Sequence, residues 1–250
     1  MTSLRAKARK VFLTLEKTYG KPVWNGNRSP VDELISTILS QNTNDANRDR
    51  AFGALRAAFP SWEDVLQARP ADIIAAIRPA GLGPQKGPRI QAVLYTIQKT
   101  RGRIALDFLC GRTPEEARAW LISLPGVGPK TAAIVMLFSL GLPAFPVDTH
   151  VYRVTGRLGL RPERMTADTA HEHLAALFDP DQYASAHLNL IRLGREVCHA
   201  RKPDCPHCPL RRMCPYPRTA SPLKITSPQS ATRNRGRKKG AGRNRTARKK

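Results

Sequence analysis

Four closely spaced cysteines have the side chains whose chemistry is easiest to define. The chain has five cysteines, and four of them follow the spacing C-x6-C-x2-C-x5-C, at Cys198, Cys205, Cys208 and Cys214. In a protein of cytosolic type such a cluster indicates a metal site and not disulfides. Four thiolates can hold zinc or a [4Fe–4S] cluster, and zinc sites usually show two short C-x2-C arms where this chain has one. Cys110 stands alone, and we expect it to be a small core residue.

A glycine-rich turn is the second candidate site. It lies in LPGVGPKTA at residues 124–132, between one amphipathic helix and a second, apolar one. Gly126 and Gly128 allow positive φ and leave room for a ligand near the backbone, while Val127 can plug into the core. The turn opens onto a helix N-terminus, whose unpaired amides favour an anion. We therefore expect this turn to bind a phosphate group. An ordinary glycine-capped connection between helices is the alternative.

Lys130 directly follows this turn, and Asp148 lies farther along in VDTH at residues 147–150. A lysine amine is neutral in only about one molecule in a thousand near pH 7, so a nucleophilic role requires burial or neighbouring cations. Asp148 could accept a proton from the amine and stabilise a cationic intermediate. In the alternative interpretation, Lys130 only binds a phosphate and Asp148 only caps the helix that begins at Thr149.

The elements that must position these residues are helices. Apolar residues recur with the helical period, strand-like alternation is scarce, and about ten helices are expected, which makes the fold class all-α. Helix starts are marked by SPVD at 29–32, SWED at 61–64 and TPEE at 113–116, where a hydroxyl side chain precedes the first helical residues. We expect Asp168 and Asp181 to cap two later helices.

The composition predicts a folded protein outside the membrane. The 250 residues are 41% apolar and 24% charged, and no apolar run approaches the roughly 18 residues that a membrane span needs. The basic N-terminus is expected to form an amphipathic helix and not a signal peptide. A cytoplasmic location is therefore expected, at the nucleoid if the source is bacterial.

The formal charge of +23 predicts a polyanionic partner. Residues 219–250 carry 11 of the 42 lysines and arginines and no acid, so the remainder still holds 31 basic against 19 acidic residues. Solubility alone is the alternative explanation of this excess. The tail itself has almost no apolar content, so we expect it to be disordered, either adding salt-sensitive affinity for nucleic acid or only solvated.

Three motifs together resemble the endonuclease III family of the helix-hairpin-helix DNA glycosylase superfamily. They are LPGVGPKTA, VDTH followed by VYRV, and the four-cysteine spacing, in that order within residues 1–218. The resemblance implies a six-helix lobe at residues 22–140 and a cluster lobe made of residues 1–21 and 141–218. Double-stranded DNA containing a damaged base or an abasic site would bind in the cleft between them, and the protein would be a monomer.

The resemblance also implies the chemistry. The family's lysine at the position of Lys130 attacks C1′ of the damaged nucleoside with help from Asp148, and the Schiff base permits β-elimination 3′ to the lesion. The expected substrates are oxidised pyrimidines, flipped out of the stack. The resemblance favours a [4Fe–4S] cluster over zinc, in a structural role. The loop between the first two ligands would present Arg201 and Lys202 to DNA phosphates.

The residue that reads the lesion is less well defined. Relatives carry a glutamine after the helix at residues 30–40, thought to fill the gap left by the flipped nucleotide. Here ILSQNTND at 38–45 places Asn42 at that position and Gln41 one residue earlier. Either side chain is a candidate, which leaves lesion preference open.

Three other functions were weighed against this one. A monofunctional glycosylase for thymine or uracil opposite guanine usually lacks the lysine, so Lys130 argues against it. An adenine glycosylase would be expected to carry a further folded C-terminal domain, for which the tail is too short and polar. A non-catalytic DNA-binding module is the alternative from another class, and the presence of both Lys130 and Asp148 argues against it.

Overall fold

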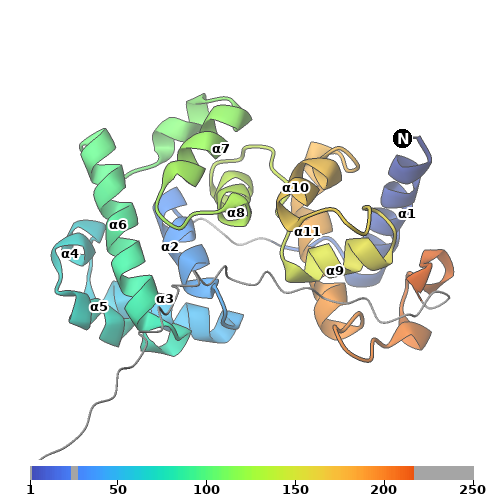
Figure 1. The fold of residues 1–250 in the computed structure, drawn as a ribbon, viewed down its shortest axis with the longest axis horizontal. Helices are drawn as coiled ribbons and strands as arrows, with labels where there is room; N and C mark the ends of the chain where they lie inside the picture. Colours follow the sequence, from blue (N-terminus) through green and yellow to red (C-terminus); the bar gives the residue numbers. More distant parts are fainter. Residues whose placement is uncertain (1, 24–27, 217–250) are drawn as a thin grey trace, which may run out of the picture. The chain divides into compact units, whose positions relative to one another are not determined.

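The chain is helical throughout the residues that the structure, a computed structural model, describes, which are 2–23 and 28–216 (Figure 1). These residues form eleven α-helices, joined by loops and short 3-10 turns, and no β-strand, which confirms the all-α prediction. No helix among them is long and apolar enough to cross a membrane. The basic tail predicted at 219–250 lies outside the described residues. The helices are α1 (Thr2–Tyr19), α2 (Pro30–Ser40), α3 (Asp45–Ala58), α4 (Trp62–Gln67), α5 (Pro70–Ala76), α6 (Gly83–Arg101), α7 (Pro114–Ser123), α8 (Pro129–Ser139), α9 (Thr149–Arg157), α10 (Ala167–Ala175) and α11 (Tyr183–Glu196).

Hydroxyl side chains cap three helices as predicted. Ser29, Ser61 and Thr113 precede α2, α4 and α7, and each side-chain oxygen accepts a hydrogen bond of 3.0–3.2 Å from the backbone N–H three residues later. At Ser61 and Thr113 the acid three residues later accepts a bond from the capping residue's own N–H, which completes a capping box. Each cap contributes about 1 kcal/mol to stability.

Three local predictions were wrong. Thr166, and not Asp168, caps α10, since its side chain accepts a bond from Thr169 N and Asp168 lies inside the first turn. Asp181 falls in the 3-10 turn Pro180–Gln182, so α11 begins one residue later than expected. Cys110 is exposed and not a core residue, because it lies in the 3-10 segment Asp107–Gly111 at the surface.

Helices α2 to α8 enclose one hydrophobic cluster, which we name the first core. Helix α2 contacts α3, α6 and α8, and the four residues Leu34, Ile35, Ile38 and Leu39 on it are completely buried. In Figure 1 these helices gather as one group. Because α2 leads into the Gln41–Asn42 segment and α8 follows the glycine-rich turn, the first core sets the position of both.

Helices α1, α9, α10 and α11 enclose a second hydrophobic cluster, the second core. The N-terminal helix reaches it from the other end of the chain and pairs with α11. Ser185 Oγ donates to Glu16 Oε1 at 3.0 Å, and Asn189 Nδ2 donates to Gly20 O at 3.1 Å. The second core therefore combines the first helix with the last third of the described chain, and it carries the helix that begins after Asp148.

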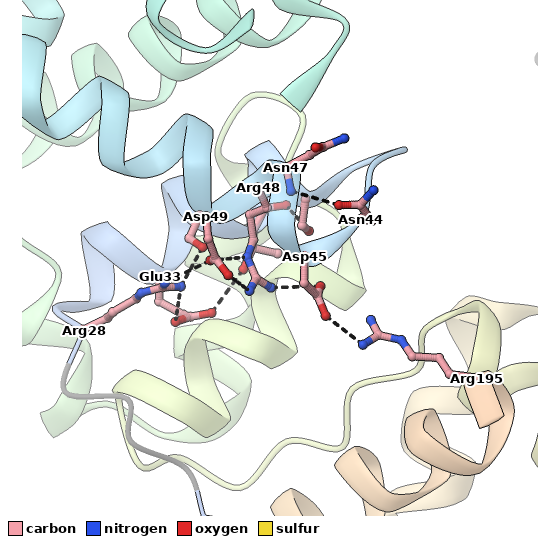
Figure 2. A network of polar contacts seen from close by, with 11 residues as sticks. Arg28, Glu33, Asn44, Asp45, Asn47, Arg48, Asp49 and Arg195 are labelled. Atoms are coloured by element: carbon pink, nitrogen blue, oxygen red, sulfur yellow. Dashed lines mark hydrogen bonds and ion pairs between the residues drawn. The ribbon is translucent and has the colours of Figure 1, made fainter. Parts of the chain in front are cut away.

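Polar contacts join elements of the two cores. Arg195 Nη1 on α11 lies 2.7 Å from Asp45 Oδ2 at the start of α3 (Figure 2). Arg118 Nη1 on α7 lies 3.6 Å from Glu172 Oε1 on α10. Both pairs involve exposed side chains, so each contributes at most about 1 kcal/mol.

Candidate active site and nucleic-acid interface

The glycine-rich turn connects α7 to α8 and is anchored through Val127. That side chain is only 5% exposed and belongs to the first core, as predicted. Gly126 has φ of +72°, so it needs the left-handed region, whereas Gly128 is extended at φ −99°. A Cβ at Gly128 would meet no atom within 4 Å. The prediction of positive φ therefore holds at Gly126 alone, and Gly128 leaves its backbone open to a ligand.

Lys130 and Asp148 lie at the N-terminal ends of two helices. Lys130 is exposed and follows Pro129, the first residue of α8. Asp148 is half-buried and caps α9, because its Oδ1 accepts a 2.7 Å bond from Val151 N. Asp148 therefore caps α9, as the alternative interpretation expected, but this role uses only one of its two carboxylate oxygens.

A buried histidine lies close enough to both residues to feel their charges. His187 is 3% exposed, and burial lowers its pKa to about 4, with smaller opposing effects from Asp148, which raises it, and Lys130, which lowers it. Geometry places His187 between the two segments, since its ring lies 5.9 Å from that of Phe138 on α8 and its Nδ1 lies 2.9 Å from Pro146 O, two residues before Asp148.

The segment after α2 distinguishes Gln41 from Asn42. Gln41 is half-buried, and its Oε1 accepts a 2.8 Å bond from Arg89 Nη1 on α6. Asn42 is exposed and has φ of +54°, a left-handed conformation that asparagine tolerates better than most residues. Asn44 then caps α3 by accepting a 2.9 Å bond from Asn47 N.

Two cations on α6, Lys86 and Arg89, hold this region together. Lys86 is 1% exposed and donates to Leu39 O at 2.7 Å and to Ala80 O at 2.9 Å, and burial lowers its pKa. Arg89 packs against Gly126 as well as bonding Gln41, since a Cβ on that glycine would lie 2.4 Å from Arg89 Nε. Nothing in the local sequence reveals the contacts with Leu39 and Gln41, because these partners are 47 and 48 residues away.

The start of α3 is fixed by a network of ion pairs. Figure 2 shows Arg48 between Asp45 and Asp49, with Arg195 approaching Asp45 from a different helix. Burial opposes ionisation of Asp45, but Arg195 and Arg48 outweigh it and hold the pKa of this carboxyl below its usual value. The exit of the 41–44 segment is therefore tied to α11.

All four clustered cysteines line one cavity. Cys198, Cys205, Cys208 and Cys214 are unpaired and half-buried around about 310 Å³ of empty space, counting its open mouth. Burial raises the pKa of the Cys208 and Cys214 thiols. Arg157 Nη1 donates to Cys198 Sγ at 3.2 Å, which favours a thiolate at that position.

The donor set at this cavity suits either of the two metals. No three Cys, His, Asp or Glu side chains among residues 2–23 and 28–216 are grouped so that they could hold one metal ion. Four half-buried thiols that line one cavity can serve as ligands of zinc or of an iron–sulfur cluster. Arg201 and Lys202 are exposed in the adjoining loop.

Comparison with known proteins identifies the family. Residues 35–180 match the HhH-GPD superfamily base excision DNA repair protein family. Endonuclease III of Thermotoga maritima is 34% identical over 187 residues, which are 75% of this chain and 83% of that protein. The chain belongs to the endonuclease III family. This endonuclease III-like protein is a base excision repair DNA glycosylase.

Two further comparisons extend the similarity of this glycosylase. A candidate DNA glycosylase of Arabidopsis thaliana is 42% identical over 146 residues, and the matched region spans half of the plant protein's length. A solved non-covalent complex of endonuclease III with DNA superimposes with a TM-score of 0.75 at 27% identity, covering 86% of this chain and 97% of the other.

Proposed function

We propose that this glycosylase is bifunctional, removing oxidised pyrimidines from duplex DNA and then cutting the abasic strand by β-elimination. The observation that supports this most is the placement of Lys130. Its amine is exposed at the start of α8, directly after the glycine-rich turn, so neighbouring cations and not burial would have to activate it as a nucleophile. Phe138 of the same helix contacts His187, which binds the carbonyl of Pro146 two residues before Asp148. The candidate nucleophile and its candidate acidic partner are thus on two segments that meet at one buried side chain.

The reaction needs the damaged nucleotide to leave the stack, which costs least for a damaged or mispaired base. Lys130 Nζ forms a bond to C1′ as the bond to the base breaks, and the bonding electron pair leaves with the base. Asp148 takes the proton that the amine loses and stabilises the cationic sugar. Opening of the sugar ring gives a Schiff base, and loss of a C2′ proton then expels the 3′ phosphate.

Backbone phosphates are proposed to bind at two places. The turn of Gly126, Val127 and Gly128, together with the N-terminus of α8, forms one of them. The Val127 N–H already donates to Leu124 O at 3.2 Å, so the phosphate would bind through the other backbone amides. Arg201 and Lys202 in the loop beside the cysteines form the other. Contacts of this kind fix the enzyme on DNA without reading sequence.

Asn42, and not Gln41, is proposed to enter the gap left by the flipped nucleotide. The amide of Gln41 is engaged by Arg89, whereas Asn42 stands exposed at a left-handed turn. A contact between the opposite base and Asn42 would leave the Arg89–Gln41 bond intact.

We propose that Cys198, Cys205, Cys208 and Cys214 hold a [4Fe–4S] cluster. When bound, the cluster cross-links the C-terminal loop, and its irons stabilise thiolates that burial alone disfavours. Arg157 would remain a hydrogen-bond donor to Cys198. The loop with Arg201 and Lys202 is then held in shape for DNA.

The two cores support the proposed division into a six-helix lobe at 22–140 and a cluster lobe made of 1–21 and 141–218. DNA would bind between the two lobes of a single copy. We infer that such an enzyme works in the compartment that holds chromosomal DNA, which is the nucleoid in a bacterium.

The experiment incubates the protein with a duplex that holds one oxidised pyrimidine, with borohydride present to reduce a Schiff base. A covalent protein–DNA adduct is expected from the wild type and not from Lys130→Gln, while Asp148→Asn slows base release. If base release persists in Lys130→Gln and the wild type gives no adduct, the enzyme is monofunctional. A thymine–guanine duplex run in parallel would then identify a mismatch glycosylase.

The metal is checked on the same preparation. A brown protein with about four irons per chain supports the cluster, since a [4Fe–4S] cluster contains four irons. A colourless protein with one zinc per chain would contradict it.

A further inference from the structure

The segment that leads to Asp148 has no regular secondary structure. Residues 141–148 connect α8 to α9 without a helix of their own, although Phe145, Pro146 and Val147 are buried. Buried backbone carbonyls outside a helix need partners from elsewhere in the protein. Here those partners decide where Asp148 lies, because it is only two residues beyond Pro146.

Two buried histidines supply the partners. His171 Nδ1 on α10 lies 3.0 Å from Phe145 O, and His187 Nδ1 on α11 lies 2.9 Å from Pro146 O. The exposed fractions of these two residues are 6% and 3%. Two consecutive carbonyls are thus held from two different helices, which fixes the direction of the chain at this point.

The chemistry of these contacts defines the form of both rings. A carbonyl oxygen only accepts, so each Nδ1 must carry the hydrogen. Burial lowers the pKa of both histidines, so each ring is neutral near pH 7 with its lone pair on Nε2. A neutral ring gives a directed hydrogen bond without placing a cation beside Asp148. A lysine or arginine there would compete with the cationic sugar for the carboxylate.

Aromatic packing reinforces the two hydrogen bonds. The ring of Phe145 stacks on Phe178, with centroids 5.1 Å apart, and meets Tyr183 edge-on at 5.5 Å. The ring of Phe138 on α8 lies 5.9 Å from that of His187. Since α8 also carries Lys130, His187 touches the helix of the nucleophile and the segment of the acid.

We propose that His171 and His187 are positioning residues that hold the backbone of Phe145 and Pro146 and thereby place Asp148 beside Lys130. This inference rests on the proposed function, in which Asp148 assists Lys130. His187 has the larger role, because it binds the carbonyl nearer to Asp148 and its ring also contacts Phe138 on the helix of Lys130, whereas His171 binds the carbonyl of Phe145.

The test compares two substitutions of each histidine in the full chain with its cluster. His187→Phe keeps a flat ring and removes the donor, whereas His187→Asn places an amide nitrogen close to the position of Nδ1. A displacement of about 1 Å at a reacting group can cost about 100-fold in rate. We therefore expect His187→Phe to slow single-turnover base release about 10- to 100-fold without weakening binding to an uncleavable abasic-site duplex, and His187→Asn to recover most of the loss. The same pair at His171 should show a smaller effect.

His173 provides a matched control. It is also on α10, and its Nε2 lies 2.9 Å from a backbone carbonyl, that of Leu160, which is outside the 141–148 segment. His173→Phe should lower the melting temperature without slowing base release. If it slows the reaction as much as His187→Phe does, general loosening explains the effect and the inference is wrong.

A double-mutant cycle tests whether the histidine acts through the acid. In an Asp148→Asn background, His187→Phe should cause no further loss of rate, because the group that it positions is already disabled. Independent, multiplied losses would overturn the inference, as would a full rate in His187→Phe. Failure of the proposed function is separate, since it would appear as an unaffected borohydride adduct in Lys130→Gln.

Discussion

Gly126→Ala is the substitution that most directly probes how the glycine-rich turn is held. At φ of +72° an alanine is strained, and its methyl carbon would lie 2.4 Å from Arg89 Nε and 2.6 Å from Arg89 Cδ. Arg89 must then move, and we expect this movement to break its hydrogen bond to Gln41. Gly141→Ala is the matched control, because Gly141 has φ of +64° and no atom within 4 Å of the added carbon.

The expected magnitudes follow from these contacts. The left-handed backbone costs a non-glycine residue about 1 kcal/mol, and both substitutions share that cost. Only Gly126→Ala adds the loss of the Arg89–Gln41 hydrogen bond, which we set at about 1 kcal/mol because both side chains are partly exposed. The total is about 2 kcal/mol for Gly126→Ala and about 1 kcal/mol for Gly141→Ala. In a domain of this size each kcal/mol lowers the melting temperature by about 2–4 °C.

The assay is thermal unfolding under anaerobic conditions, followed by far-ultraviolet circular dichroism. The two glycine substitutions are measured alone and in an Arg89→Ala background, where the excess cost of Gly126→Ala should disappear. DNA binding gives a second measure, since Gly126→Ala should weaken affinity for an abasic-site duplex and Gly141→Ala should not. Equal melting temperatures for the two variants, or an excess that persists without Arg89, would refute the coupling.

Three further predictions concern stability. Burial depresses the pKa of His187 from 6.5 to about 4. The contribution of the neutral ring to the free energy of unfolding is therefore complete above pH 6.5, and about 3 kcal/mol of it is lost as the pH falls toward 4. Unfolding of the wild type and of His187→Asn as a function of pH measures this loss. A double-mutant cycle on Asp45→Asn and Arg195→Gln should give a coupling below about 1 kcal/mol that weakens in high salt, and a salt-independent value would contradict a surface pair. Cys205→Ala should lower iron content and melting temperature together, whereas Cys110→Ala should change neither, as checked by metal analysis and calorimetry.

Features encoded in short stretches of sequence could be predicted. The caps at Ser29, Ser61 and Thr113 depend on a side chain and an amide three residues apart, and each forms as expected. Val127 is buried as the pattern indicated. The all-helical fold followed from the helical period of the apolar residues. The family and the glycosylase function followed from motif order, and all three are confirmed.

Predictions failed where two local signals competed. Thr166 and Asp168 are both good capping residues, and the backbone turns helical early enough for Thr166 to take the role. Cys110 has the side chain of a core residue but lies in a surface 3-10 segment. The roles of Lys130 and Asp148 and of the four clustered cysteines stay predictions.

The sequence by itself determined the all-helical fold and where the turn between α7 and α8 lies, and it named the candidate side chains for the chemistry, since these depend on neighbours within a few residues. Tertiary structure alone decided the surroundings of those side chains. Arg89 reaches Gln41 and leaves Asn42 exposed, and His187 reaches the carbonyl of Pro146. These partners are 48 and 41 residues apart in the chain, and only packing of the helices around the cores brings them within hydrogen-bond distance.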